Sequence, residues 1–427
     1  MTNPRYIIDM ILKNLEIFNI VIIKDRIKMN ENMPKIYIDY NATTPLRPEV
    51  KAAMLEDMDI YGNASSMHAS GRRAHAQVEQ ARDTVEKLIG AQRQTVFFTS
   101  GGSESNNTVF QTMRQLAGAQ SGSPLKEDRC EFITTAIEHP CVLNSAKYLQ
   151  GLGFKVIFLP VDEYGKVKMD ALKNALSEKT LFVSVMTANN ETGTIQDIKE
   201  ISALAKAAGA WMHTDATQAT GKIPVNVDDL GVDYLTMSAH KIYGPKGIGA
   251  LYVRKGAPSF PLIHGGHQEN GLRAGTYNNL GIIGFSRAAA IAADEIEKYG
   301  REISALRNCL RDGLIAAIPH IKINGHQTDI LPNTLNVSFP GAEGEAILLS
   351  MDLMGIEAST GSACASGSLE PSHVLMAIGL GPELAHGSIR FSLGWGISAD
   401  DIDYIVKTLP PIIARLRAMS SIGDNYA

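Results

Sequence analysis

Lys241 has a side chain suited to covalent chemistry and stands where such chemistry is often found. It lies in the run SAHKIYGPKG at residues 238–247, directly after an apolar segment with the character of a buried strand. Burying a lysine amine is costly, and a functional role is a common reason for it. The amine could form a Schiff base with an aldehyde. The alternative is an ordinary surface lysine, which is the better interpretation of Lys246 in the following glycine-rich turn.

Cys364 is a second candidate nucleophile, in the run STGSACASGS at residues 359–368. Side chains this small cannot dock a segment firmly, so the composition predicts a mobile loop. A thiolate on such a loop could accept an atom in a pocket and deliver it elsewhere. For Cys130, Cys141 and Cys309 we favour the role of a small apolar side chain. No CxxC pair occurs, which disfavours a disulfide framework or a zinc knuckle and fits a reducing compartment.

Two further segments could bind a charged ligand. A glycine turn at residues 98–107 leads from an apolar run into a helical pattern, so Gly102 and Ser103 could offer backbone amides to a phosphate. Asp215 ends another apolar run, where open α/β sheets place their ligands. Its carboxylate could pair with the protonated ring nitrogen of pyridoxal phosphate, or it could merely cap the next helix. Ser238 and His240 could reach the cofactor phosphate.

The elements that must position these residues are strands with helical crossovers between them. Continuous apolar runs with helix-like segments between them indicate a mostly parallel sheet that is buried on both faces. We therefore expect an α/β protein with a three-layer domain. The predicted strands cover residues 96–98, 132–135, 156–161, 181–186, 211–214, 234–237 and 250–253.

The C-terminal part predicts a smaller α+β unit. A long amphipathic helix over residues 282–314 is followed by strands at 334–339 and 388–393, with a helix at 343–354 between them. Ser398 and Asp401 form a helix N-terminal signature, and Pro410 with Pro411 should end or kink that last helix. The polar residues 118–129 predict a surface loop.

Composition excludes several classes. The chain has 427 residues, 44% of them hydrophobic and 20% charged, which is typical of a soluble protein with two domains. The net charge of -5 gives no reason to expect nucleic acid or an anionic membrane as partner. Residues 1–32 form an atypical extension whose apolar run is too short to span a bilayer. Either translation starts at Met29 or Met33, or the extension is a genuine extra helix.

These motifs together resemble those of the cysteine desulfurases of the class V aminotransferase group, from about Met33 onward. Serine replaces a more usual threonine at Ser103, and Asn270 and Trp395 also depart from the pattern. The long cysteine loop favours the nitrogen-fixation and iron-sulfur-cluster type. Besides the glycine turn, the matching runs are 37–45, 138–139, 189–193, 215–218, 240–241, 265–269, 273–276, 361–364 and 388–391.

The resemblance implies a fold and a set of roles. The fold would be that of the type I pyridoxal phosphate transferases, with a mostly parallel seven-stranded sheet between helices. The large cofactor domain would span residues 47–297, the small domain 298–427, and residues 33–46 would join the small domain. His139 would stack on the cofactor ring, Asn190 and Gln218 would lie near the ring hydroxyl and the substrate, Arg390 would bind the substrate carboxylate, and Thr276 would reach the partner subunit's cofactor in a homodimer.

The reaction implied is removal of sulfur from L-cysteine, giving alanine and a persulfide on Cys364, with His139 as a candidate proton acceptor. The sulfur would pass to an iron-sulfur scaffold or another acceptor protein in the cytoplasm, and Cys364 would be a transient iron-sulfur ligand shared with that partner. A selenocysteine lyase or a transaminase would share the cofactor site. A catalytically silent sulfur scaffold is disfavoured because Lys241, Asp215 and Cys364 are all present.

Overall fold

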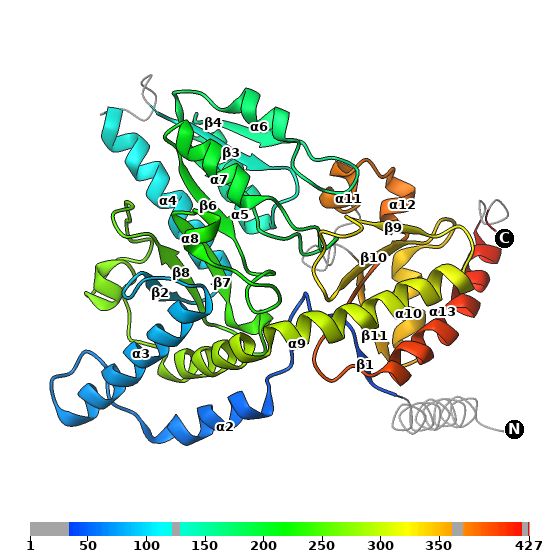
Figure 1. Ribbon diagram of the computed structural model, residues 1–427, viewed down its shortest axis with the longest axis horizontal. Coiled ribbons are helices and arrows are strands. Elements are labelled where there is room, and N and C mark those ends of the chain that lie inside the picture. Colours follow the sequence, from blue (N-terminus) through cyan, green and yellow to red (C-terminus); the bar gives the residue numbers. More distant parts are fainter. Residues whose placement is uncertain (1–33, 122–128, 361–369, 421–425, 427) are drawn as a thin grey trace, which may run out of the picture.

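The computed structural model describes residues 34–121, 129–360, 370–420 and 426 (Figure 1). Residues 1–32, Cys364 and residues 361–368 of the predicted loop lie outside the described residues. Within the described ranges, no helix is long and apolar enough to cross a membrane.

The largest sheet has seven strands in the order β2-β8-β7-β6-β5-β3-β4. Only β8 runs antiparallel to its neighbours, so the sheet is mostly parallel, as predicted. All of the predicted strands of this sheet are present. They are β2 (Val96–Thr99), β3 (Glu131–Thr135), β4 (Lys155–Leu159), β5 (Thr180–Ser184), β6 (Trp211–Asp215), β7 (Tyr234–Ser238) and β8 (Gly249–Val253).

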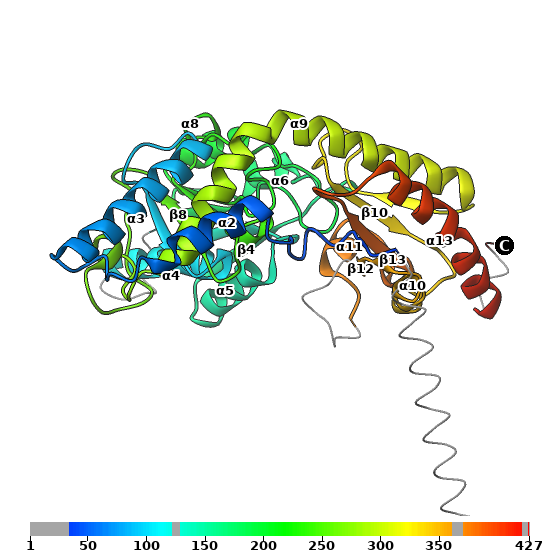
Figure 2. The ribbon, with the colours of Figure 1, turned by 90° about the horizontal axis from the view of Figure 1, so that it is seen from below.

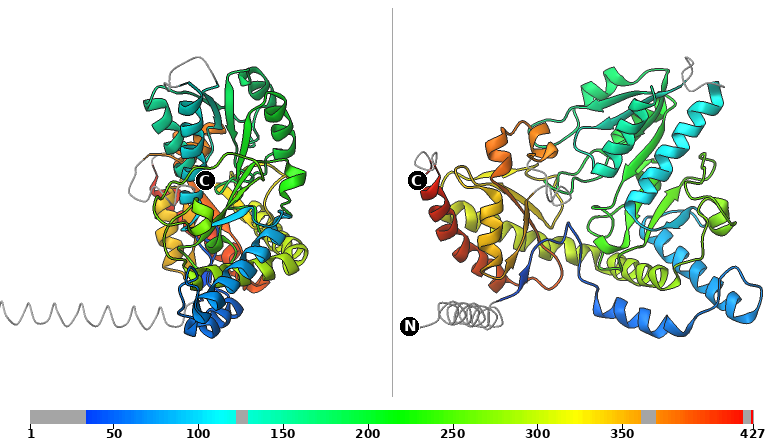
Figure 3. Two further views of the ribbon diagram at one scale, coloured as in Figure 1. Left: turned by 90° about the vertical axis from the view of Figure 1, so that its left-hand side faces the viewer. Right: turned by 180° about the vertical axis from the view of Figure 1, so that it is seen from behind.

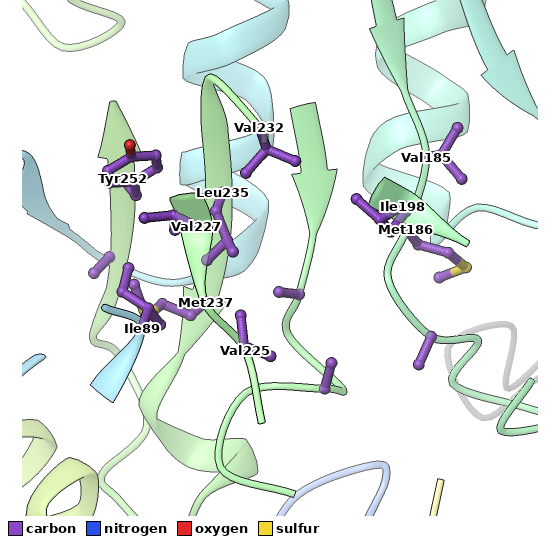
Figure 4. Close-up of a cluster of buried hydrophobic side chains, with 14 of the residues drawn as sticks. Ile89, Val185, Met186, Ile198, Val225, Val227, Val232, Leu235, Met237 and Tyr252 are labelled. Carbon is purple, nitrogen blue, oxygen red and sulfur yellow. The ribbon is translucent and has the colours of Figure 1, made fainter. Parts of the chain in front are cut away.

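Helices cover both faces of this sheet, and alternate strand residues pack into two different cores. In β7, Leu235 and Met237 join a core with α3 and α9, whereas Tyr234 joins a core beneath α4 and α5. Figure 4 shows part of the first core, where Leu235 and Met237 lie near Tyr252 of β8. Burial on both faces explains why these strands are continuously apolar. The helices of this part are α2 (Pro48–Glu56), α3 (Ala69–Leu88), α4 (Gly102–Ser121), α5 (Pro140–Gly151), α6 (Met169–Ala175), α7 (Ile198–Ala207) and α8 (Val227–Leu230), with the short 3₁₀ helices η1 (Asp57–Asp59), η2 (Ala239–Lys241) and η3 (Gln268–Gly271).

A second, antiparallel sheet has the strand order β12-β13-β10-β9. Its core includes residues of α10, α13 and the C-terminal half of α9, together with Ile36 and Ile38 from the start of the described chain. Figure 2 shows α9 passing from the helices of the large sheet to the small one. Its elements are β9 (Lys322–Asn324), β10 (Thr334–Ser338), α10 (Gly344–Asp352), β12 (Ser359–Thr360), α11 (His373–Ala377), α12 (Pro382–His386), β13 (Ser388–Ser392) and α13 (Ala399–Met419), beside the parallel pair β1 (Ile36–Tyr37) and β11 (Ile356–Glu357).

The long helix α9 spans Asn279–Ala317 without a break, so it runs through the predicted boundary at residues 297–298. Its N-terminal half packs on α3 and its C-terminal half on α13 (Figure 3). The domain boundaries themselves stay predictions.

Three local predictions need correction. Residues 359–360 are not loop but form β12, because their backbone pairs with the edge of β13. The polar segment from residue 118 is helical as far as Ser121, and residues 122–128 lie outside the described part. Of the two predicted outcomes at Pro410 and Pro411, an end of helix α13 is wrong, because the helix continues to Met419. Ser398 and Asp401 do form the predicted capping box.

Candidate active site

The predicted site residues converge on one cavity of about 550 Å³ at the carboxyl ends of the large sheet's strands. Asp215 ends β6, Ser238 ends β7, and Arg390 reaches the cavity from β13 of the small sheet. The cavity therefore lies where both sheets contribute side chains. The predicted residues that line it are Gly102, Ser103, His139, Asn190, Asp215, Gln218, Ser238, His240, Lys241 and Arg390.

The glycine turn after β2 forms one end of this cavity, where Gly102 and Ser103 begin α4. The turn lies against β8 so closely that a Cβ on Gly249 would stand 2.7 Å from the Cα of Gly101. Glycine at these positions therefore lets the turn sit directly over the sheet. The N-terminus of α4 turns its first amides and its positive dipole end toward the cavity, which suits a phosphate.

Side chains around the same end add polar groups. The hydroxyl oxygen of Thr217 is buried without a hydrogen-bond partner among the described residues, and the residue lines the cavity. The Nδ1 of His240 lies 3.1 Å from the hydroxyl of Thr43. Burial, reinforced by the nearby Lys241, lowers the pKa of His240 to about 4, so its ring is neutral near pH 7. A phosphate would supply the partner that Thr217 lacks.

The carboxylate of Asp215 is held in a fixed orientation. It is 6% exposed, and one oxygen accepts from Nδ2 of Asn106 at 2.7 Å while the other accepts from the backbone amide of Thr217 at 2.9 Å. The amide contact is local and turn-like, so the alternative of a purely capping aspartate accounts for only half of this arrangement. A carboxylate with free lone pairs remaining can still accept a charged N–H.

His139 caps α5 at the cavity wall. Its Nδ1 accepts from the backbone amide of Cys141 at 3.2 Å and lies 3.0 Å from the Cys141 sulfur. Burial lowers the pKa of His139, against the opposing effect of Asp215, so the neutral ring is favoured. A neutral imidazole in the cavity wall could stack on a flat ring or accept a proton.

Lys241 is not on the strand itself but at the end of the single turn η2 that follows β7. Its Nζ donates to the backbone carbonyls of Asn41 at 2.5 Å and of Ala42 at 2.7 Å, both in the segment before α2. This segment, far away in the sequence, thus holds the amine inside the cavity.

Gln218 is fixed by a buried lysine that the sequence did not single out. Lys222 is 3% exposed, and its Nζ donates to Oε1 of Gln218 at 2.7 Å and to Oδ1 of Asn41 at 3.0 Å. Nε2 of Gln218 donates to the carbonyl of Asn41 at 3.0 Å. The carboxamide of Gln218 therefore has one orientation only. Burial, with Lys241 and Arg390 nearby, lowers the pKa of Lys222 well below its usual range.

Arg390 is buried, at 2% exposure, on a strand that lies between β12 and β10. Arg390 is therefore neither a surface residue nor on an edge strand. Its Nη1 donates to the carbonyl of Asn190 at 3.2 Å and its Nη2 to Oδ1 of Asp39 at 2.7 Å. Its Nε has no partner among the described residues. A guanidinium with an unused N–H at a cavity wall suits a carboxylate ligand.

Two predicted residues are not brought to this cavity within the described chain. Thr276 is exposed between η3 and α9 and does not line it. Cys364 lies outside the described residues, although His373, which follows that segment, lines the cavity. Lys246 is exposed, as predicted.

Comparison with known proteins shows which family the chain belongs to. Residues 36–405 match the family Aminotransferase class-V. The chain belongs to the class V aminotransferase family. It is 48% identical over 393 residues to the cysteine desulfurase IscS of Dictyoglomus turgidum, which covers 92% of this chain and 98% of that one.

Solved structures of the family agree with this. A NifS-like protein is 39% identical, with a TM-score of 0.83 over 90% of this chain and 100% of that one. SspA in complex with cysteine is 35% identical, with a TM-score of 0.73 over 84% of this chain and 98% of that one.

Enzymes of the class V aminotransferase family use pyridoxal phosphate, and the cavity fits that cofactor. The phosphate would meet the N-terminus of α4 and the unpartnered hydroxyl of Thr217, and the ring nitrogen would meet Asp215. The aldehyde would meet Lys241.

Several cavity residues were missed at the level of sequence. Asn106 lies one turn of α4 beyond Ser103, so helical spacing could have placed it on the same face. Cys141 follows the singled-out His139 by two positions, yet we expected only an apolar role for it. Asn41 lies in the matching run 37–45 but was given no role, and Lys222 was not singled out; their mutual contact joins segments 181 residues apart.

Proposed function

We propose that this family member is a cysteine desulfurase, which takes the sulfur of L-cysteine and releases L-alanine. The observation that carries the proposal is the pairing, in one cavity, of a buried guanidinium with an unused N–H, Arg390, and a lysine amine, Lys241. The guanidinium suits the carboxylate of an α-amino acid, and the lysine amine suits the cofactor aldehyde with which the substrate's amine would react. The thiol of Cys364, placed just before the cavity residue His373 in the chain, supports sulfur chemistry.

Pyridoxal phosphate, when bound, would supply an aldehyde for a Schiff base and a ring that withdraws electrons from the substrate's α-carbon. Asp215 would keep the ring nitrogen protonated, held in place by Asn106. Lys241 would hold the aldehyde carbon at rest, and its amine, once released, would move the α-proton. Arg390 would fix the substrate carboxylate through its free Nε.

Sulfur transfer would be the task of Cys364. Its thiolate would attack the substrate sulfur, forming an S–S bond as the carbon–sulfur bond breaks, and the electron pair would stay with the carbon skeleton until it is protonated to alanine. The proton of the Cys364 thiol needs an acceptor. His139 is the candidate, because burial lowers its pKa and favours the neutral ring; its accepting nitrogen, Nδ1, would exchange its contacts with Cys141 for that proton.

We further propose a homodimer, in which the exposed Thr276 reaches the partner subunit's cofactor phosphate. The persulfide sulfur would pass in the cytoplasm to an iron-sulfur scaffold or another acceptor protein. Cys364 would be a transient iron-sulfur ligand shared with that scaffold. Names of relatives such as the IscS of Dictyoglomus turgidum support this direction.

The test uses purified wild type, Lys241→Ala and Cys364→Ser. Wild type should bind pyridoxal phosphate with visible absorbance and, with reductant, release sulfide and alanine in equal amounts from L-cysteine. Lys241→Ala and Cys364→Ser should both lose sulfide release, and Cys364→Ser should keep the cofactor. Sulfide release by Cys364→Ser at the wild-type rate would overturn the persulfide mechanism, and a strong preference for L-selenocysteine would make the enzyme a selenocysteine lyase.

A further inference from the structure

Cys141 connects two cavity groups to which the proposed function gives separate roles, His139 and Asp215. Its sulfur lies 3.0 Å from Nδ1 of His139 and 3.1 Å from Nδ2 of Asn106. The same Nδ2 lies 2.7 Å from Oδ2 of Asp215. A continuous chain of contacts therefore runs from Asp215 through Asn106 and Cys141 to His139, all lining the cavity.

The direction of each hydrogen bond follows from the chemistry of its end groups. The carboxylate of Asp215 can only accept, so the side-chain nitrogen of Asn106 faces it and donates one N–H to it. The second N–H of Asn106 points to the sulfur, which accepts it. Nδ1 of His139 already accepts the backbone amide of Cys141, so it carries no proton of its own. The remaining donor is the Cys141 S–H, which donates to that Nδ1.

The thiol stays protonated in this position. Burial raises the pKa of Cys141 to about 12, and the carboxylate of Asp215 acts in the same direction, against hydrogen bonds from Asn106 and Ser103. Cys141 is therefore a hydrogen-bond donor near pH 7 rather than a second nucleophile beside the substrate.

We propose that Cys141 is a positioning residue, whose thiol ties the ring of His139 to the Asn106–Asp215 pair. The ring of His139 can then neither turn nor tilt without breaking its contact with Cys141, which is itself bonded to the partner of Asp215. The proposal rests on the proposed function only in assigning His139 and Asp215 to the cofactor. If Cys141 acts through this hydrogen bond, the variants Cys141→Ala and Cys141→Ser should differ in their affinity for pyridoxal phosphate.

The test compares Cys141→Ala with Cys141→Ser, with Cys309→Ser as control because Cys309 is an exposed thiol on α9. Serine keeps a donor and an acceptor, whereas alanine removes both. Apoprotein of each variant is titrated with pyridoxal phosphate, and ¹⁵N spectra of histidine-labelled protein report Nδ1 of His139, assigned by its loss in His139→Gln. We expect a dissociation constant about threefold to tenfold higher for Cys141→Ala, from one lost hydrogen bond.

The Cys141→Ser variant should stay within about twofold of wild type, and the Nδ1 resonance should move in Cys141→Ala only. Wild-type affinity and an unmoved resonance in Cys141→Ala would overturn the proposal, as would equal losses in alanine and serine. These measurements need no turnover, so they stand even if L-cysteine is not the substrate. Failure of the proposed function would instead appear as absent sulfide release in wild type.

Discussion

Nη2 of Arg390 donates to Oδ1 of Asp39 at 2.7 Å, while its buried Nε has no partner in the described part of the chain. The aspartate thus fixes the guanidinium from one side and neutralises its charge within the fold. Nη1 is held by the carbonyl of Asn190 at 3.2 Å, which leaves Nε as the group that a ligand could engage. This division explains how a cation that is only 2% exposed can be kept at a cavity wall before a substrate arrives.

The first prediction concerns Arg390→Lys. Lysine offers a point charge without the planar fork, so it cannot hold Asp39 and a substrate carboxylate in the same geometry. We expect the KM for L-cysteine to rise about tenfold to hundredfold, as for one lost hydrogen bond between charged groups, with a smaller change in kcat. Alanine formation at varied L-cysteine measures both. Arg415→Lys, at an exposed position of α13, should behave as wild type, and an unchanged KM in Arg390→Lys would remove Arg390 from substrate binding.

A second prediction tests the buried amine of Lys222. In Lys222→Met the carboxamide of Gln218 loses the donor that fixes Oε1, so cofactor affinity should fall about threefold to tenfold. Fluorescence titration of apoprotein with pyridoxal phosphate measures this. Lys173→Met on α6 is the control, because that side chain is exposed.

The variant Lys222→Met should also change how the free energy of unfolding depends on pH. The pKa of Lys222 lies well below 10.5 in the folded state, so between these two values the unfolded chain binds more protons. The free energy of unfolding of wild type therefore rises with pH in this window, and Lys222→Met should lack that part of the rise. Thermal melts across this pH range should show wild type gaining on the variant. A melting-temperature difference between wild type and Lys222→Met that does not change with pH would mean that Lys222 is not neutral in the folded state.

The strand ends Asp215 and Ser238 could be predicted because apolar runs mark buried strands, and polar residues after them mark the carboxyl edge of a parallel sheet. The contacts of Lys222 and Asn41 could not. Asn41 lies 181 residues from Lys222 and 200 from Lys241, and this proximity arises only when the segment before α2 folds back across the cavity. Cys141 packs against the core beneath α4 and α5 as predicted, but its hydrogen bond with Asn106 depends on a neighbour that local sequence does not specify.

The third prediction concerns Glu138, whose carboxyl group accepts from the amide of Met186 at 3.0 Å. Burial raises the pKa of Glu138 from 4.5 to about 8, with Asp215 acting in the same direction. Between these pH values the folded state holds a proton that the unfolded chain releases, so this group makes the free energy of unfolding fall as pH rises.

Glu138→Gln keeps the accepting oxygen and cannot ionise, so it should lose this slope. Its melting temperature relative to wild type should therefore increase from pH 5 to pH 8. Taking the difference between the two proteins at each pH cancels the contributions of the other titrating groups. Glu178→Gln, at an exposed position, should show no such trend. A flat difference for Glu138→Gln would show that Glu138 is already ionised in the fold.

The last prediction concerns the ion pair of Arg82 and Glu269, which ties the segment of η3 to α3 and β2. Nη1 and Nη2 of Arg82 donate to the two carboxylate oxygens of Glu269 at 2.7 and 2.9 Å, and one oxygen also accepts from the amide of Phe98. The two side chains are 8% and 2% exposed. Removing Arg82 leaves the carboxylate of Glu269 buried without its cation, which typically costs about 3–5 kcal/mol, whereas Arg82 without Glu269 keeps an ion pair with Glu79 at 3.1 Å.

Arg82→Gln should therefore lower the melting temperature strongly and Glu269→Gln less, because Arg82 keeps Glu79, and the double variant should lose less than the sum of the two. The exposed pair Arg93 and Asp83 is the control, since Arg93 is 79% exposed and such pairs contribute about 0–1 kcal/mol. Because the segment after Glu269 leads to Thr276, both single variants should also weaken the proposed homodimer, measured by sedimentation. Additive losses in the double variant would show that the two charges do not depend on each other.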